Sequence, residues 1–399
     1  MAVLSLVLQI AAIGLFRQTH YRSGDDHFAF GWEMGRIARS LALGQGFSNP
    51  YGDSTGPTAW EPPLYPWIMG GVFTIFGVYS TASAWVLLSF NSLLNALTCI
   101  PVFLIARKTF GERVAWWSAW IWALVPYEMY WAIHWPWDTT LSPLALAWIF
   151  WLSLELEQWK GWKGWAIYGA LWGVVALANP SILAFLPFSG LWIWWRRHKR
   201  GAPSLGRVAL AAVVFFASIT PWMVRNYQTF GRPVFIRDDF GLQFRLGNGP
   251  YADGWSRVYL QPNLSVPEFQ KFKQMGEIAY AARCNRLALD WIGRHPGRFA
   301  VITLKKCFYY WNGIPKPTNS VAPVDFRDSL FLASSLLALC GLGLALKRRL
   351  PGAWLFLWLV LSYPTVYYIV YPHARYRHPI EPELLVLGVG LFFELRWRR

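Results

Sequence analysis

Long apolar stretches separated by short polar segments run through almost the whole chain. A helix that crosses a bilayer needs about 20 mainly apolar residues, and most of these stretches approach that length. Their recurrence predicts an all-α polytopic membrane protein with about 10 transmembrane helices. The predicted segments cover residues 2–16, 82–106, 114–132, 139–157, 165–178, 181–195, 207–224, 328–346, 351–370 and 380–395.

Clusters of Lys and Arg separate several of these segments and predict how the chain is oriented. Short cytoplasmic loops carry an excess of Lys and Arg. Placing every cluster in the cytoplasm is consistent with ten spans and a cytoplasmic N-terminus. The first span is short, but no basic region precedes it and no cleavage site is evident, so we expect it to be retained. The clusters lie at residues 107–113, 160–163, 196–200, 347–349 and 396–399.

The same topology predicts two long external loops, residues 17–81 and 225–327. Residues 63–79 are apolar but short and begin with Pro-Pro, and a full span there would reverse the placement of the cluster at 107–113. We therefore expect a re-entrant or interfacial helix there and a second one at 28–43, where Arg36 and Arg39 lie among apolar neighbours. In the second loop, residues 267–294 favour a helix, whereas the glycine-rich residues 241–254 favour tight turns.

Composition agrees with a membrane protein. The chain has 399 residues, of which 55% are hydrophobic and 15% charged, which excludes an ordinary soluble or disordered protein. The net charge of +16 does not indicate a nucleic-acid partner, because much of the excess sits in loops beside apolar segments. The four cysteines do not form a disulfide framework pattern, and small buried thiols are the expected role.

Residues 371–382 concentrate cationic side chains between two strongly apolar stretches. Arg375, Arg377 and His378 lie there, and Arg225 ends another span on the same predicted side. Arginine holds phosphate by paired, charge-assisted hydrogen bonds, so we interpret the cluster as a site for a lipid phosphate. The alternative is interfacial anchoring by arginines that reach the membrane surface.

Several acidic residues on the same predicted side are candidates for catalysis. Asp25 and Asp26 follow the first span directly, where a carboxylate can accept a proton from an acceptor hydroxyl; a solvated turn or helix cap is the alternative. Glu61 lies in an apolar, aromatic frame and needs a partner there. Asp138, in the turn that starts at His134, is either a helix N-cap or a cavity residue.

Two carboxylates in such a cavity could hold a divalent metal, although no spacing in the sequence requires one. No Walker, Rossmann, catalytic-serine or zinc pattern appears in the sequence. Handling of a soluble nucleotide is therefore not predicted.

Taken together, these segments resemble the GT-C membrane glycosyltransferases, in particular the bacterial branch related to protein O-mannosyltransferases and lipid A aminoarabinose transferases. Each motif is weak alone, but together they keep the family order over nearly the whole chain. The matching positions are Asp25-Asp26, Glu61-Pro-Pro-Leu-Tyr65, Asp138, Pro221-Trp222 with Arg225-Asn226, Gly247-Asn-Gly249 and Arg375-Tyr-Arg-His-Pro-Ile380.

The resemblance implies a single transmembrane domain over residues 1–399 in a bacterial plasma membrane, with its active site on the outer face. It implies inverting transfer of a sugar from a polyprenyl-phosphate donor to a lipid, protein or glycan acceptor, and some relatives use a metal. Asp25 or Asp26 would be the general base. The donor phosphate would be bound by Arg375, Arg377, Arg225 and His378, and the substrates oriented by Glu61, Asp138 and His134.

The sequence leaves two other functions open. A transporter or flippase of lipid-linked saccharides would be expected to carry charged residues within its spans and to have two related halves with broken helices. A polysaccharide polymerase or ligase would use a similar donor without needing Asp25.

Overall fold

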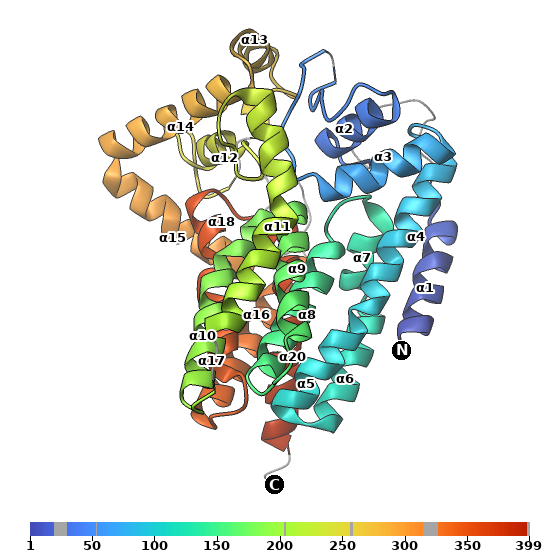
Figure 1. Cartoon of the computed structure of the whole chain (residues 1–399), viewed down its shortest axis with the longest axis vertical. Coiled ribbons are helices and arrows are strands. Elements are labelled where there is room, and N and C mark those ends of the chain that lie inside the picture. The colour runs from blue at the N-terminus through green and yellow to red at the C-terminus, as the bar shows by residue number, and fades with distance from the viewer. Residues whose placement is uncertain (20–29, 53, 203–204, 256–257, 314–325, 397–399) are drawn as a thin grey trace.

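The computed structural model describes residues 1–19, 30–52, 54–202, 205–255, 258–313 and 326–396. Every named secondary-structure element in these ranges is a helix. Long helices run roughly along the longest axis and form a bundle, and shorter helices gather at one end of it (Figure 1). The predicted all-α architecture is therefore confirmed.

Helices occupy all of the predicted apolar segments. By length and composition, three stretches in the described ranges can cross a membrane: Thr81–Phe110, Leu205–Phe230 and Leu330–Lys347. The others are shorter, so the number of spans stays a prediction. The bundle consists of α1 (Ala2–Leu15), α4 (Thr81–Leu97), α5 (Cys99–Phe110), α6 (Glu112–Leu124), α7 (Pro126–His134), α8 (Leu141–Leu156), α9 (Lys163–Ala178), α10 (Leu186–His198), α11 (Leu205–Phe230), α16 (Phe326–Lys347), α17 (Ala353–Ser362), α18 (Thr365–Ile369) and α20 (Glu381–Arg396).

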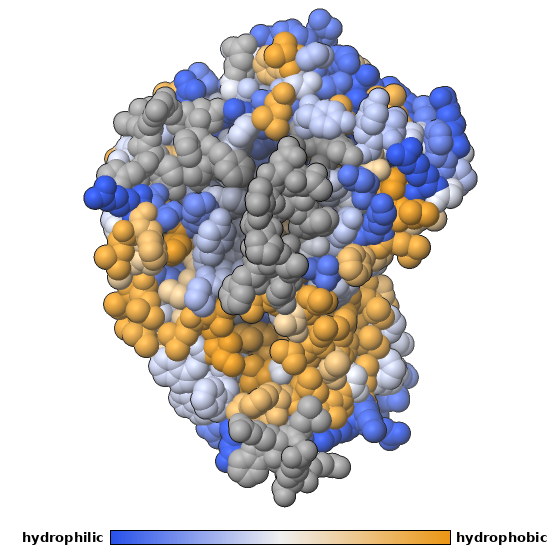
Figure 2. Space-filling model, turned by 180° about the vertical axis from the view of Figure 1, so that it is seen from behind, coloured by the Kyte–Doolittle hydropathy of each residue, from blue (hydrophilic) through white to orange (hydrophobic). Residues whose placement is uncertain are grey.

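A band of hydrophobic residues crosses the middle of the molecule, and hydrophilic residues lie toward both ends (Figure 2). Large apolar side chains on the bundle surface, such as Leu191 and Val213, are more than 60% exposed. An apolar surface of this extent needs a nonaqueous partner, and a bilayer is the partner that a helical bundle of this kind fits. The chain is an integral membrane protein.

The basic turns meet at one end of the bundle. The α5–α6, α8–α9, α10–α11 and α16–α17 connections lie there together with the C-terminal end of α20 (Figure 1). Arg196 and Arg200 each approach Glu157 to 2.6 Å, and Arg207 donates to the carbonyl of Lys160 at 2.8 Å. The basic clusters at 160–163 and 196–200 thus lie at the same end of the bundle, with Arg207 beside the first and Glu157 beside the second, as the charge pattern predicts.

The opposite end carries the short helices. There α2 (Glu33–Ala42) packs on α3 (Leu64–Phe76), and α12 (Phe240–Gly247), α13 (Val266–Met275), α14 (Glu277–Arg294) and α15 (Pro296–Asn312) form a second group (Figure 1). The two groups come from the two predicted external loops. They cover the end of the bundle at which residues 371–380 cross between α18 and α20.

Two predictions for the second loop need correction. Residues 240–247 form a helix, not tight turns, because their glycines serve close packing. A Cβ at Gly241 would lie 2.0 Å from the carbonyl oxygen of Ala281, and one at Gly247 only 1.7 Å from that of Val370. The predicted helix at 267–294 is divided into α13 and α14 at Gly276, whose φ of 76° is readily adopted by glycine.

Candidate active site

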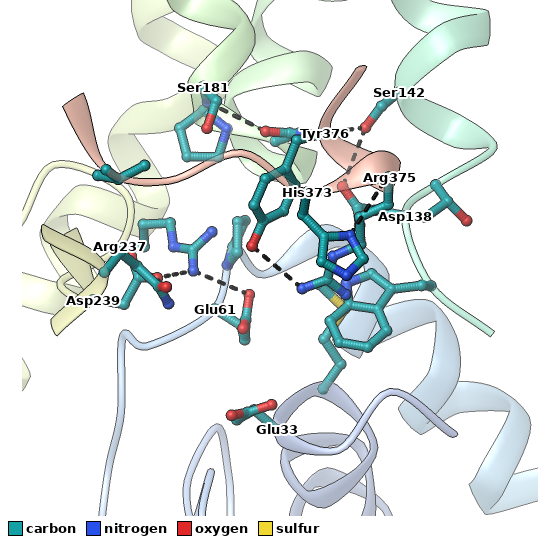
Figure 3. Close-up of a pocket in the computed structure, with 18 of the residues that line it drawn as sticks. Glu33, Glu61, Asp138, Ser142, Ser181, Arg237, Asp239, His373, Arg375 and Tyr376 are labelled. Carbon is teal, nitrogen blue, oxygen red and sulfur yellow. Dashed lines mark hydrogen bonds and ion pairs between the residues drawn. The ribbon is translucent and has the colours of Figure 1, made fainter. Parts of the chain in front are cut away.

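A cavity of about 770 Å³ lies where the short helices meet the bundle. Its walls come from distant parts of the chain, and Figure 3 shows the polar side chains that face it. Polar and charged lining residues include Glu33, Glu61, Asp138, Ser142, Asn179, Ser181, Arg237, Asp239, Gln243, Gln261, Asn263, His373 and Arg375.

Arg375 reaches the cavity from the short helix α19 (Ala374–Arg377). His373 caps this helix by accepting a hydrogen bond from the backbone N–H of Arg375 at 3.3 Å. The guanidinium lies 4.1 Å from the ring centroid of Trp137 and donates to the Tyr376 hydroxyl at 3.5 Å. Within the described residues it forms no ion pair, and its Nε atom has no hydrogen-bond partner. Arg375 is therefore a half-buried cation still able to bind an anion.

Arg237 is the second cation in the cavity, and it is already paired. Its guanidinium contacts the carboxylate of Asp239 and lies 3.6 Å from that of Glu61 (Figure 3). Burial raises the pKa of Glu61 to about 8, although Arg237 acts in the opposite direction. At neutral pH Glu61 can therefore carry a proton and donate a hydrogen bond.

Asp138 lies three residues before the start of α8. The N-cap position of this helix is taken by Thr140, not by Asp138. Its carboxylate accepts from the Ser142 hydroxyl at 3.1 Å, and Ser142 in turn accepts from the Asn179 amide at 3.4 Å. Burial raises the pKa of Asp138, and the charge of Arg375 opposes that rise. Asp138 was predicted to be either a helix N-cap or a cavity residue, and the structure favours the cavity residue.

A chain of hydrogen bonds connects the two arginines. Gln243 donates to Asp239 at 2.8 Å and accepts from the Tyr371 hydroxyl at 2.6 Å. The Tyr371 hydroxyl lies 3.3 Å from that of Tyr376, which accepts from Arg375. Helix α12 and the segment before α20 therefore hold the cavity walls together.

A model of the family described as dolichyl-phosphate-mannose-protein mannosyltransferase matches residues 60–224. Among solved structures, the archaeal oligosaccharyltransferase AglB from Archaeoglobus fulgidus, in complex with an inhibitory peptide and a dolichol-phosphate, is 16% identical. Its TM-score is 0.54, and the match covers 99% of this chain and 50% of AglB. The apo form of the Archaeoglobus fulgidus oligosaccharyltransferase is 15% identical with a TM-score of 0.56, covering 100% and 51% of the two chains.

This chain has the GT-C membrane fold. The fold that the predicted resemblance implies is thus confirmed. The GT-C fold here spans about half the length of the oligosaccharyltransferase that it matches. ArnT from Cupriavidus metallidurans bound to undecaprenyl phosphate is 13% identical, with a TM-score of 0.44, and the match covers 98% of this chain and 77% of ArnT. A comparison with curated proteins found no match.

In this GT-C fold Arg377 lies apart from the cavity that Arg375 faces. Its side chain is 1% exposed, and the guanidinium donates to Glu381 at 2.5 Å, to Ser334 at 2.6 Å and to the Phe331 carbonyl at 3.1 Å. It lines a second, mainly apolar cavity of about 700 Å³ between α6, α16 and α20. These bonds leave little of Arg377 for a phosphate.

His378 is fully buried within the bundle. Its ring lies between Trp122 and Trp131, and its Nδ1 is 3.0 Å from a Glu128 oxygen. The surroundings of His378 therefore do not favour the phosphate contact that the sequence predicts.

Arg225 and His134 also lie outside the lining of the cavity. Arg225 donates to the carbonyls of Thr58 at 2.6 Å and Phe47 at 2.9 Å, so it supports the loop that carries Glu61. The Nδ1 of His134 lies 2.9 Å from the Gln18 side-chain oxygen, and its ring stacks on Tyr130. Both residues contact the protein itself, and their predicted substrate contacts stay predictions.

Asp25 and Asp26 lie outside the described residues, so their predicted role as general base is untested. Among the residues described, no three His, Cys, Asp or Glu side chains are grouped closely enough to hold a metal ion.

Sequence reasoning missed Arg237, Asp239 and Glu33. The sequence does contain a signal for Arg237 and Asp239. Residues 237–239 are a charged run between Ile236 and Phe240 in a predicted external loop. Glu33 lies on the predicted interfacial helix at 28–43, but no pattern indicated which face would meet the cavity.

Proposed function

We propose that this protein transfers a sugar from a polyprenyl-phosphate donor to an acceptor hydroxyl, with inversion at the anomeric carbon. The supporting observation is Arg375, a half-buried cation without an ion pair among the described residues, in a cavity that also holds Glu61 and Asp138. A donor of this kind keeps its tail in lipid while its phosphate reaches the cavity. The acceptor is a lipid, a protein or a glycan.

Arg375 would bind the donor phosphate and stabilise it as it leaves. The phosphate gains negative charge when the bond to the anomeric carbon breaks, and a preorganised cation lowers the barrier most at that point. The Tyr376 hydroxyl, which contacts Arg375, and the neighbouring Tyr371 hydroxyl would orient the same oxygens. Arg237 would set the charge of the opposite wall.

Asp25 or Asp26 would act as the general base that accepts the proton of the acceptor hydroxyl. Glu61 and Asp138 would orient the sugar or the acceptor through hydrogen bonds. A protonated Glu61, with its pKa of about 8, would donate to a sugar oxygen. A divalent metal in this site remains a further option for the carboxylates.

We place the cavity on the outer face of a bacterial plasma membrane. The placement rests on charge. Helices α2 and α12, which contribute lining residues to the cavity, lie at the end of the bundle opposite to the basic turns (Figure 1). Basic loops are retained in the cytoplasm. Residues 17–81 and 225–327 would then be the external loops that close over one transmembrane domain.

The experiment that tests this proposal measures sugar transfer from a panel of radiolabelled polyprenyl-phosphate sugars. It uses membranes that contain the full chain. We expect one donor to release polyprenyl phosphate with the wild-type protein and none with the D25A/D26A double variant. The D290N variant, which changes an exposed carboxylate on α14, is the matched control and should retain activity.

The same assay separates the competing functions. Full activity of the D25A/D26A variant would remove the base assignment and favour a polymerase or ligase. No release with any donor and acceptor, together with movement of a lipid-linked saccharide across liposomes, would establish the transporter or flippase instead.

A further inference from the structure

Helix α15 exposes an apolar stripe on one face and buries a polar anchor on the other. Val301, Leu304 and Phe308 are 54%, 70% and 60% exposed, and their spacing places them on one side of the helix. Lys306, on the buried side, donates to the Asn248 side chain at 2.8 Å and to the carbonyl of Ile369 at 2.9 Å. This contact fixes which face of α15 points outward.

The depth of α15 follows from its contact with α16. The Ser335 hydroxyl donates to the carbonyl of Trp311 at 2.6 Å, near the C-terminal end of α15. Ser335 lies inside the candidate span Leu330–Lys347. The end of α15 therefore lies beside a part of α16 that crosses the membrane. Leu304 precedes Trp311 by only about two turns of helix.

The exposed stripe also adjoins a surface that already faces lipid. Helix α15 packs on α16, whose Leu336 and Leu337 are 54% and 50% exposed within the same candidate span. At the other end of α15, the α14–α15 junction is basic, with Arg294 and Arg298 exposed. Apolar residues toward the bilayer and arginines at its edge are the arrangement of an interfacial helix.

We propose that α15 docks into the phospholipid leaflet on the cavity side of the membrane. Phe308 and Leu304 insert among the upper acyl chains, Val301 lies at the boundary, and Arg294 faces the lipid phosphates. The docked helix supports the cavity wall, because Lys306 joins it to Asn248 at the end of α12 and to Ile369, two residues before Tyr371. This proposal does not depend on the sugar-transfer activity.

The experiment places a solvatochromic fluorescent amino acid at position 304 of the full chain, in nanodiscs that contain one copy of the protein. The matched control carries the same residue at Val266, which is 73% exposed on α13, far from the basic end of the bundle (Figure 1). We expect blue-shifted emission at 304 that is quenched by lipids with a nitroxide on the upper acyl chain. The emission at 266 should stay water-like and unquenched.

If the variant labelled at position 304 does not fold, the same label at position 301 provides a second measurement. We expect weaker quenching there, because Val301 lies at the boundary of the acyl chains. Water-like emission at both positions would overturn the proposal. Blue-shifted emission without quenching by the nitroxide lipid would instead identify a protein contact and would also overturn it.

Discussion

Arg375 and Arg377 are two residues apart, yet the structure uses them in opposite ways. Arg375 faces the cavity and forms no ion pair with a carboxylate among the described residues. Arg377 is buried and donates hydrogen bonds to Glu381, to Ser334 and to a backbone carbonyl. The first is a cation that still needs an anion. The second already has its hydrogen bonds. The comparison shows that a shared sequence motif does not imply a shared role.

Breaking the buried pair should have the largest effect. In the R377M variant Glu381 keeps a buried charge without its partner, and we expect the free energy of unfolding to fall by about 3–5 kcal/mol. The R377M/E381L double variant removes both charges and should recover most of that loss. Denaturant unfolding in detergent micelles measures both. Equal stability of R377M and the wild type would contradict a structural role for Arg377.

Removing the cation of the cavity should affect activity but not stability. We expect R375A to lower kcat/KM for the donor by about 10²–10³-fold, since one preorganised transition-state contact is lost. R375K keeps a point charge without the guanidinium fork and should lose less. Unfolding curves serve as the control. Unchanged kinetics in R375A would reduce this arginine to a membrane anchor.

Changing the charge of the opposite wall should have a smaller effect. R237Q removes the positive charge that contacts the buried carboxyl groups of Asp239 and Glu61, so the cavity loses a cation and binds a phosphate less tightly. We expect the donor KM to rise by roughly tenfold, about 1.4 kcal/mol, with a smaller change in kcat. R232Q, at an exposed arginine, is the matched control. An equal donor KM in the two variants would argue against this charge coupling.

The smallest predicted effect concerns the loop that carries Glu61. Glu277 accepts from the backbone N–H of Ala59 at 2.6 Å, and burial raises its pKa to about 8. The folded state therefore binds a proton more tightly than the unfolded state does, and stability falls as pH rises between about 4.5 and 8. Between pH 6 and 7 this amounts to at most about 1.4 kcal/mol. E277Q should flatten that dependence in thermal unfolding; an unchanged slope would exclude Glu277 as its source.

Much of the fold was predictable because its signals are local. Apolar stretches predicted the helical segments, and the basic turns predicted which connections share one end of the bundle. Three candidate site residues that the sequence analysis named, Glu61, Asp138 and Arg375, line one cavity, and their roles there stay predictions. A charged residue beside an apolar segment is noticeable in sequence because it is costly there without a partner.

What the sequence by itself determined is therefore the all-α membrane architecture, its helical segments and the basic connections that share one end of the bundle. Only the tertiary structure decided which charged side chains meet. The pairing of Arg237 with Glu61, the turning away of Arg377 and the use of Arg225 as a loop support join residues far apart in the chain. Glycines that predicted turns instead allowed α12 to pack against Ala281 and Val370. The physical reason is that hydropathy acts segment by segment, whereas hydrogen bonds and close packing depend on the neighbours that folding brings together.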